Sequence, residues 1–435
     1  MNGTLSLVLT GDSMITRGLA MGEDDAARDL AAHIGDADVA LTNLEVLPND
    51  FRGYPAQESG GTHLAAGPWV LDECAGLGSH LFPAATNHAL DYSVEGLLAT
   101  IDVLDAKALA WAGLGRNLAE ARMPAYLDTD RGSIALISAC STFARGQQAS
   151  NQRPDMPGRP GLNPLRSTTV YDVTESQLAA LREIAEAVGV EQRRQERIAL
   201  GFGPPPADPA IFPFFDTSFR AAAEPAIRTE PHAGDLAAIG QWVREARGRA
   251  DLVVMSLHVH DQGATKEDPA GFIPVFARAM IDAGADVVVG HGPHLLRGME
   301  LYQGRPIFYS LGNFVAQNDL VHKFPSDAYE RFRVDPSLTP SEIARTRSDD
   351  GRRGFPSDPR YWESVAPRLE WRDGALVSIE LVPVTLGHGQ PVHRRGRPRR
   401  ARADHARSIL DRFATLSEPF GTCIAIEDGR GWVRL

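Results

Sequence analysis

The sequence is poor in cysteine and in long apolar runs. Its three cysteines, Cys74, Cys140 and Cys423, are widely separated, and none belongs to a C-x-x-C pair. This spacing argues against a disulfide framework and against a thiolate zinc site. No stretch approaches the roughly 18 apolar residues that a membrane helix needs, and the N-terminus lacks the basic region of a signal peptide. We therefore expect a soluble cytoplasmic protein with no membrane partner.

Net positive charge is also lacking. The formal charge of −12 at pH 7 opposes non-specific attraction to nucleic acid, so we expect no nucleic-acid partner. One basic run, residues 394–402, departs from this balance through Arg394, Arg395, Arg397, Arg399, Arg400 and Arg402. In an acidic chain such a run is more typical of a solvated loop, and attraction of an acidic peptide is the alternative.

Strand-like and helix-like segments alternate along most of the chain. In the first 145 residues we expect strands at 5–9, 39–43, 81–86 and 134–139, and helices at 24–33 and 93–106. After residue 235 we expect helices at 235–247, 270–283 and 403–416, and strands at 252–257, 286–289, 300–302, 306–310, 376–381 and 423–427. The alternation predicts an α/β layered fold, with a single domain over residues 1–435.

Two segments interrupt this alternation. Residues 146–235 are rich in proline, glycine, arginine and glutamine, with one helix expected near 174–198. We interpret this segment as an ordered insertion that covers the strand ends as a lid, and a disordered linker is the alternative. Residues 321–370 are polar and are expected to form a second, loop-like insertion.

Five expected strands end at residues whose types commonly bind cations in proteins. The chain has Asp12 after the first strand, Glu45 after the second, Asn87-His88 after the third, His258 after the fifth and His291 with His294 after the sixth. Ligands gather at the carboxyl ends of parallel strands, and divalent cations choose carboxylate, amide and imidazole groups together. Each residue alone has a bland explanation as a cap, a turn former or a solvated side chain. Their recurrence at five strand ends favours a metal site.

Two strand ends carry two histidines each, and the local sequence predicts a different arrangement of the rings at each of them. His258 and His260 alternate where a loop begins, so we expect one of them, His258, to enter the site. His260 then orients a ligand or lines a substrate channel. The Gly-Pro pair between His291 and His294 permits a tight turn that brings both rings inward. Asn313, which follows a further strand, is expected to bond this histidine loop.

Several motifs together resemble the CapA-type family of poly-γ-glutamate capsule-synthesis proteins. They are Gly11-Asp12, Asn43-Leu44-Glu45, Asn87-His88-Ala89-Leu90-Asp91, Ser256-Leu257-His258, Gly290-His291-Gly292-Pro293-His294 and Tyr309-Ser310-Leu311-Gly312-Asn313-Phe314. That family is similar to the calcineurin-like metallophosphoesterases. The resemblance implies a four-layer α/β/β/α sandwich with metals at the strand ends.

The resemblance also implies roles for single residues. Asp12, Asn87, His258, His291 and His294 match metal-ligand motifs, Glu45 stands where a bridging aspartate is usual, and His88 matches an acid or base beside the metals. Three features depart from phosphoesterases: Met14 replaces an expected histidine, Glu45 replaces an aspartate, and the last motif has an extra residue between its histidines. One-metal and two-metal sites both stay open, with Zn, Mn, Fe or Ca as the divalent ion.

Two enzyme functions follow from these expectations. The chain is similar to the epimerases of lasso-peptide biosynthesis, which invert the Cα of the C-terminal residue of a precursor peptide. For that reaction His88 and His294 are the acid and base, with Asp12 as ligand or alternative base. The alternative is a metal-dependent hydrolase of a phosphoester or a γ-glutamyl amide, with His88 protonating the leaving group. A third hypothesis is a binding protein that keeps a metal site without catalysis.

Overall fold

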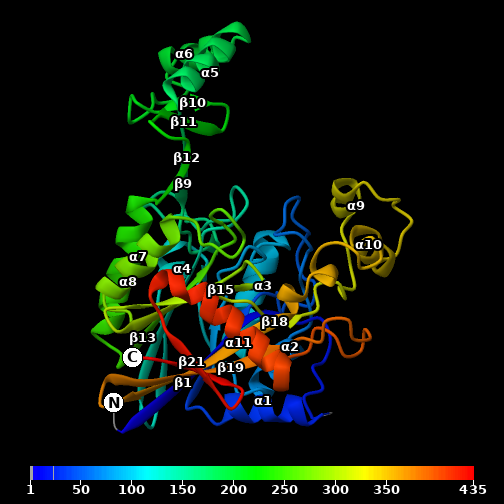
Figure 1. Cartoon of the computed structure of the whole chain (residues 1–435). Helices are drawn as coiled ribbons and strands as arrows, with labels where there is room; N and C mark the ends of the chain where they lie inside the picture. Colours follow the sequence, from blue (N-terminus) through cyan, green and yellow to red (C-terminus); the bar gives the residue numbers. More distant parts are fainter. Residues whose placement is uncertain (1–2, 23) are drawn as a thin grey trace.

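The computed structural model describes residues 3–22 and 24–435. Two β-sheets pack face to face with helices on both outer sides, as expected for an α/β/β/α sandwich (Figure 1). The first sheet runs in the order β21 (Ile424–Glu427), β22 (Arg430–Val433), β19 (Ala375–Thr385), β18 (Glu363–Arg372), β1 (Thr4–Met14), β2 (Val39–Leu44), β3 (Leu81–Pro83) and β4 (Ala110–Ala112). In addition, β17 (Asn313–Ala316) pairs with β1, and β20 (Arg399–Arg400) pairs with β19.

The second sheet has six strands. Their order is β15 (Leu296–Tyr302), β16 (Arg305–Leu311), β14 (Val287–His291), β13 (Leu252–His258), β7 (Gly132–Cys140) and β6 (Ala125–Thr129). A small pair, β5 (Leu114–Gly115) with β8 (Gly161–Leu162), lies outside both sheets. The strands β1, β2 and β3 are mutually parallel, and so are β7, β13 and β14. Their carboxyl ends therefore meet at one edge of each sheet.

Alternating side chains build the core between the sheets. Leu7 and Leu9 of β1 pack against Val254 of β13 in one buried cluster. The intervening residues Val8 and Val253 point away from this space and pack under the outer helices. Because both faces of these strands are buried, their sequences are apolar almost throughout, which explains why β1 and β13 could be predicted.

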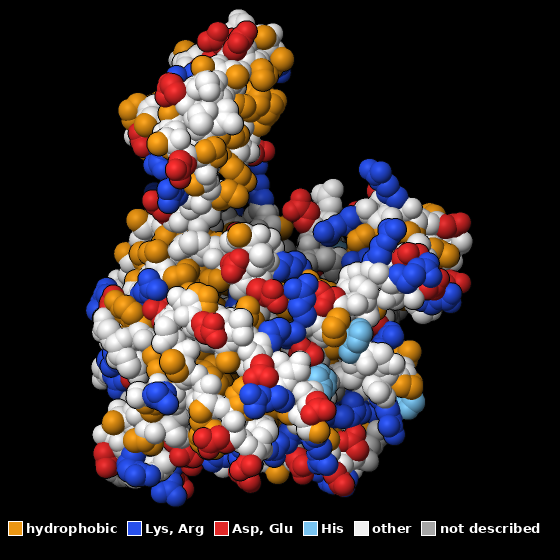
Figure 2. Space-filling view, viewed as in Figure 1, with side chains coloured by type: hydrophobic (Ala, Val, Ile, Leu, Met, Phe, Trp, Pro, Cys, Tyr) orange, Lys and Arg blue, Asp and Glu red, His pale blue; other side chains and the backbone are white. Residues whose placement is uncertain are grey.

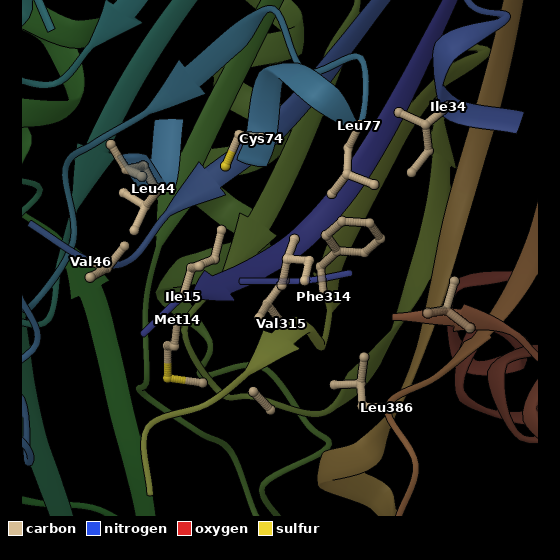
Figure 3. Close-up of a cluster of buried hydrophobic side chains, with 14 of the residues drawn as sticks. Met14, Ile15, Ile34, Leu44, Val46, Cys74, Leu77, Phe314, Val315 and Leu386 are labelled. Carbon is tan, nitrogen blue, oxygen red and sulfur yellow. The ribbon is translucent and has the colours of Figure 1, made fainter. Parts of the chain in front are cut away.

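The helices cover the two outer faces. On the first sheet lie α1 (Asp25–Gly35), α2 (Trp69–Gly76) and part of α3 (Ser93–Ala106), with their apolar residues in the cluster drawn in Figure 3. On the second sheet lie α7 (Ala233–Arg247) and α8 (Phe272–Asp282). The long helix α11 (Ala403–Ser417) packs on β15 and β19, and the short α4 (Leu118–Arg122) lies beside β5. In the described ranges, no helix is both long and apolar enough to cross a bilayer.

The first insertion contains a separate small unit, which we call the arm (residues 167–231). Its sheet has the order β10 (Phe212–Phe214), β11 (Thr217–Ala221), β9 (Ser167–Val173) and β12 (Ala226–Pro231), with α5 (Glu175–Ala187) and α6 (Val190–Ala199) beside it. The predicted single helix is broken at Gly189, where φ is +71°. The arm has its own core around Leu178 and Phe212 and projects away from the sandwich (Figures 1 and 2). Its action as a lid stays a prediction.

The second insertion is more regular than expected. It contains α9 (Ser326–Phe332), α10 (Pro340–Arg347), two 3₁₀ turns (Phe355–Ser357 and Pro359–Trp362) and the beginning of β18. The strand β18 differs most from the predicted loop over 321–370, because it lies at the centre of the first sheet between β1 and β19. Pro367 and the charged residues around it hide the strand pattern in the sequence.

Candidate metal centre

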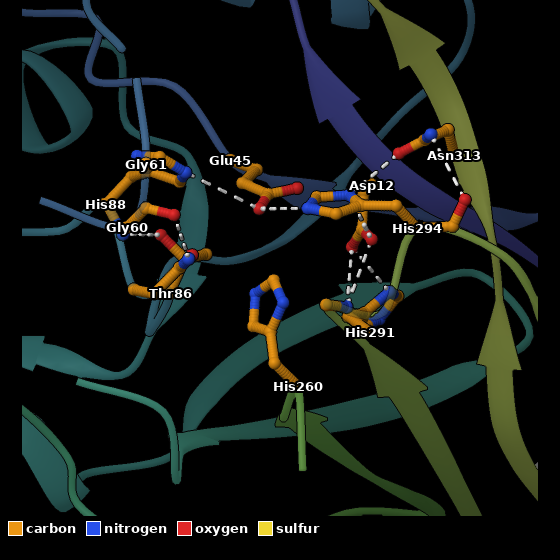
Figure 4. A network of polar contacts seen from close by, with 12 residues as sticks. Asp12, Glu45, Gly60, Gly61, Thr86, His88, His260, His291, His294 and Asn313 are labelled. Atoms are coloured by element: carbon orange, nitrogen blue, oxygen red, sulfur yellow. Dashed lines mark hydrogen bonds and ion pairs between the residues drawn. The ribbon is translucent and has the colours of Figure 1, made fainter. Parts of the chain in front are cut away.

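The parallel strands deliver most of the predicted site residues to one place. Pairing of β1 with β2 sets Asp12 beside Asn43, and pairing of β13 with β14 sets His258 beside His291. The predicted site residues are all buried: Asp12, Glu45, Asn87, His88, His258, His291 and His294. Figure 4 shows five of them, Asp12, Glu45, His88, His291 and His294, converging from different strand ends on one space. The geometry agrees with a cation site built from residues far apart in the sequence.

Asp12 is held by two donors. Its Oδ2 accepts a hydrogen bond from the backbone N–H of Gly292 at 3.0 Å, and its Oδ1 accepts one from Asn43 Nδ2 at 2.9 Å. Gly292 has φ of +108°, and a Cβ at that position would lie 3.0 Å from backbone atoms of Val259. Only glycine lets the histidine loop approach Asp12 so closely. Nδ1 of His291 lies 3.6 Å from Asp12 Oδ1.

Glu45 lies at the centre of the site without a hydrogen-bond donor. Neither carboxyl oxygen has a partner in the described part of the chain, and the side chain is fully buried. Three imidazoles surround its Oε1, with Nε2 of His258 at 3.6 Å, of His294 at 3.7 Å and of His88 at 3.9 Å. Burial and the nearby charges of Asp12 and Asp91 raise the pKa of Glu45 well above its ordinary value. A bound cation would supply the compensating charge that this carboxylate needs.

His88 is oriented by a carboxylate. Its Nδ1 lies 2.7 Å from Oδ2 of Asp91, which also accepts a hydrogen bond from the backbone N–H of Leu64 at 2.7 Å. Because an ionised carboxylate can only accept, Nδ1 of His88 carries the proton. The other nitrogen, Nε2, then presents its lone pair toward Glu45. Asp91 closes the motif Asn87-His88-Ala89-Leu90-Asp91, but the sequence alone did not predict this contact with His88.

His294 is oriented by an amide instead. Its Nδ1 lies 2.9 Å from Oδ1 of Asn313, whose Nδ2 donates to the backbone carbonyls of His294 and Tyr361 at 3.2 and 2.9 Å. The role predicted for Asn313, to bond the histidine loop, is confirmed. His294 itself has φ of +65°, a conformation that costs energy for a residue with a side chain and that is concentrated at functional sites.

The strand end after β13 brings two imidazoles into the site. Nε2 of His260 lies 3.2 Å from Nε2 of His258, and Nδ1 of His258 lies 3.4 Å from Asn43 Nδ2. The sequence predicted that only His258 enters the cluster, but the structure places the rings of both His258 and His260 there. Burial lowers the pKa of His258 and of His260 well below the ordinary value, and neighbouring histidines add to the effect. Both rings are therefore neutral near pH 7, the form that binds metals.

His291 and Asn87 also have buried polar atoms that a cation could contact. Both ring nitrogens of His291 and Oδ1 of Asn87 are buried without a hydrogen-bond partner among residues 3–22 and 24–435. Burial lowers the pKa of His291 to about 4. Together with Glu45, these groups would each lose hydration without compensation unless a ligand is present. The oxygen and nitrogen donors suit a divalent cation, and two sets of donor atoms lie within 4.8 Å of one another: Glu45, His258 and His260, and Asp12, Glu45 and His294.

A cavity of about 810 Å³ opens above the histidines. His88, His260 and His294 form part of its wall, and the second insertion supplies much of the rest. Its basic lining residues are Arg17, Lys266, Arg345, Arg347, Arg353 and Arg395, against the two carboxylates of Asp319 and Asp350. Basic side chains gather around the hollow between the main body and the lobe that carries α9 and α10 (Figure 2). No described residue of the arm lies in the cavity wall.

Much of the basic run is paired within the chain. Arg395 contacts Asp319, Arg399 Nε lies 2.6 Å from Asp24 Oδ2, and Arg402 Nη2 lies 2.5 Å from Asp29 Oδ2. Such pairs neutralise part of the charge that a nucleic acid would contact. The absence of a nucleic-acid partner stays a prediction.

Comparison with known proteins agrees with the motifs. The family model described as bacterial capsule synthesis protein PGA_cap matches residues 6–318. The chain is 34% identical to the uncharacterized protein y4uA of Sinorhizobium fredii, over 99% of this chain and 93% of that protein. It is 25% identical to the capsule biosynthesis protein CapA of Bacillus anthracis, over 72% of this chain and 60% of that protein. A probable polyglutamine synthesis accessory protein of Mycobacterium tuberculosis is also 25% identical, over 70% of this chain and 67% of the relative.

The matched region contains every predicted site residue, the six strands of the second sheet, and β2, β3, β4, β17 and most of β1 from the first sheet. The chain belongs to the PGA_cap family of bacterial capsule synthesis proteins and has its calcineurin-like α/β fold.

Proposed function

We propose that the protein is a metal-dependent peptide epimerase that inverts the Cα of the C-terminal residue of a ribosomal (lasso) precursor peptide. The observation that carries the proposal is the placement of His88 and His294 on opposite sides of Glu45 (Figure 4). Inversion at carbon needs a base on one face and an acid on the other. Both imidazoles also line the same cavity, so a substrate bound there could meet one as the base and the other as the acid.

The hydrogen bonds behind the two rings support different roles for them. Asp91 places a carboxylate behind His88, and this negative charge stabilises the ring when it carries two protons. Asn313 places a neutral amide behind His294. We therefore assign the acid to His88 and the base to His294. His294 removes the Cα proton at its Nε2, and His88 returns a proton from its Nε2 to the other face.

The donor set supports a divalent cation as the cofactor. Asp12, Glu45, Asn87, His258 and His291 would hold it, which leaves His294 for proton transfer. When bound, the cation supplies positive charge beside the substrate carboxylate and so favours loss of the adjacent Cα proton. The basic residues of the cavity, among them Lys266 and Arg347, support binding of a peptide by its terminal carboxylate.

Proton exchange in heavy water tests the proposal. Metal-loaded protein is expected to introduce deuterium at Cα of the last residue of a precursor peptide, as read by mass spectrometry. His88→Ala and His294→Ala are each expected to lower this exchange by about 10²-fold or more. His393→Ala, at an exposed histidine, is the matched control. Inversion without deuterium uptake would contradict the mechanism.

A metal-dependent hydrolase is the second candidate, and the His88–Asp91 pair favours it. An imidazole held by a carboxylate at a cavity wall can also protonate a leaving group. Release of phosphate from aryl phosphomonoesters, or of glutamate from γ-glutamyl peptides, would then depend on His88. Such release without Cα exchange would favour this function over epimerisation.

A further inference from the structure

The strand end after β13 presents two imidazole nitrogens to the same point. Nε2 of His258 and Nε2 of His260 are 3.2 Å apart, and Nε2 of His258 is 3.6 Å from Glu45 Oε1. The donor atoms of the three residues all lie within 4.8 Å of one another. Atoms bound about 2.1 Å from one tetrahedral ion are about 3.4 Å apart. The separations of 3.2 Å between the two histidine nitrogens and 3.6 Å between His258 and Glu45 lie on either side of that value.

The backbone explains why both rings point the same way. The N–H of Val259 donates to the carbonyl of His291 at 2.8 Å, and the N–H of His260 donates to Thr142 Oγ1 at 2.8 Å. The chain therefore stays extended past the end of β13, so alternate side chains share one side. The ring of His260 lies 5.2 Å from that of His258 and 5.2 Å from that of His294 (centroid distances).

Glu45 supplies an independent observation. A hydrogen bond between the neutral rings of His258 and His260 uses one nitrogen of each ring. It gives neither oxygen of Glu45 a partner, and no other described residue provides one. A shared cation satisfies all three groups at once.

We infer that His260 is a direct ligand, together with His258 and Glu45, of the cation in this site, and that the added imidazole selects a borderline transition ion such as Zn²⁺ over Ca²⁺. Imidazole nitrogen suits zinc, whereas calcium prefers sites made of oxygen. The inference rests on the proposed function only in that both require a bound cation. His260 thereby supplies an imidazole from a strand end where the sequence had predicted one ligand.

Metal binding without substrate tests this assignment. Metal-free protein is titrated with Co²⁺, Zn²⁺ and Ca²⁺ separately, with the Co²⁺ visible spectrum, competition and the melting temperature as readouts. His260→Ala is expected to weaken Zn²⁺ binding by about 100-fold or more, to lower the intensity of the Co²⁺ spectrum and to reduce the preference for Zn²⁺ over Ca²⁺. His260→Gln removes the imidazole with less change in volume and is expected to behave alike, whereas His393→Ala keeps wild-type binding.

The outcomes separate the two proposals. Unchanged Zn²⁺ affinity in both His260 variants, or a wild-type preference for Ca²⁺, would overturn the assignment of His260 even if Cα exchange is observed. Weakened Zn²⁺ binding in the variants, with no Cα exchange in the wild type, would support His260 as a ligand and reject the epimerase. The melting temperature of each metal-free variant shows whether the change in binding follows from loss of the fold.

Discussion

Asn313 determines which nitrogen of His294 carries a proton. Its Nδ2 donates to two backbone carbonyls, so its Oδ1 must face Nδ1 of His294 and accept a hydrogen bond from it. Nε2 of His294 is therefore unprotonated in the neutral ring and faces Glu45 at 3.7 Å. One buried amide on β17 thus fixes the chemical state of an imidazole on another strand end.

Replacing Asn313 by leucine tests this relationship. Asn313→Leu keeps the approximate volume but leaves two buried carbonyls and one ring N–H without partners. The free energy of unfolding is expected to fall by about 3 kcal/mol, as measured by urea denaturation. Cα exchange is expected to fall as well, because His294 loses its fixed tautomer. Asn151→Leu, at an exposed asparagine, is the control. Equal stability and equal exchange in the two variants would show that the amide has no such role.

The predictable part of the site is the part set by strand pairing. Asp12, His258 and His291 end apolar runs, and parallel strands bring their carboxyl ends together, so the sequence was sufficient to group them. The direction of His260 was not predictable, because it depends on the bond between Val259 N–H and the carbonyl of His291. That contact joins loops that the sequence does not place side by side.

The strand β18 of the first sheet could not be predicted from the sequence for a similar reason. The strand β18 pairs with β1, although their paired residues Val8 and Arg368 are 360 positions apart. Its pattern is broken by Pro367 and by charged residues at the sheet surface, so local periodicity could not identify it. The chain also gave no local signal for the separation of the arm from the sandwich, because that depends on which apolar residues pack together.

Deletion of the arm tests both its independence and its predicted action as a lid. The N–H of His232 donates to the carbonyl of Arg166 at 2.7 Å, so the two ends of the arm are adjacent and a short Gly-Ser linker can join them. Arg166 and Arg122 are fixed at this base by Asp235, at 2.7 and 3.0 Å. Because the arm has its own core, the sandwich is expected to fold without it and to keep its Zn²⁺ affinity. Its melting temperature is expected to fall only slightly, because the N–H of Phe272 at the start of α8 loses its acceptor, Thr229 Oγ1, at 3.0 Å.

The lid interpretation makes a separate prediction for the same deletion variant. If the arm closes over the bound peptide, the KM for Cα exchange is expected to rise while Zn²⁺ affinity stays constant. Exchange measured over a range of peptide concentrations provides this value. An unchanged KM would reject the lid and leave the arm as a unit with another role.

Arg297 is expected to hold the loop that follows His260. It is fully buried, and its Nε and Nη2 donate to the carbonyls of Lys266 and Asp261 at 2.9 Å each. Burial lowers the pKa of this guanidinium to about 10. Arg297→Met leaves the two carbonyls without donors, so unfolding free energy is expected to fall by about 3 kcal/mol. Hydrogen exchange in the loop should also become faster. Arg305→Met, at a partly exposed ion pair, is the control, and equal effects in both would contradict this role.

The stability of the protein is expected to depend on pH through His33, far from the metal centre. Burial, opposed by the carboxylate of Glu380, lowers the pKa of His33 to about 4, and its Nε2 has no partner among the described residues. The pKa is lower in the folded than in the unfolded chain, so as pH falls below about 6.5 the unfolded chain binds a proton that the folded chain does not. His33 therefore lowers stability progressively from pH 7 towards pH 4 and has no effect at higher pH.

Replacement of His33 by glutamine removes this titration. Between pH 7 and pH 5, the wild-type protein is expected to lose about 2 kcal/mol of unfolding free energy that His33→Gln keeps. Urea denaturation of both proteins at each pH, with metal removed by a chelator, isolates the effect from the titration of the metal ligands. His393→Gln, at an exposed histidine, should follow the wild type. Parallel pH profiles for wild type and His33→Gln would mean that His33 becomes protonated in the folded chain as readily as in the unfolded one.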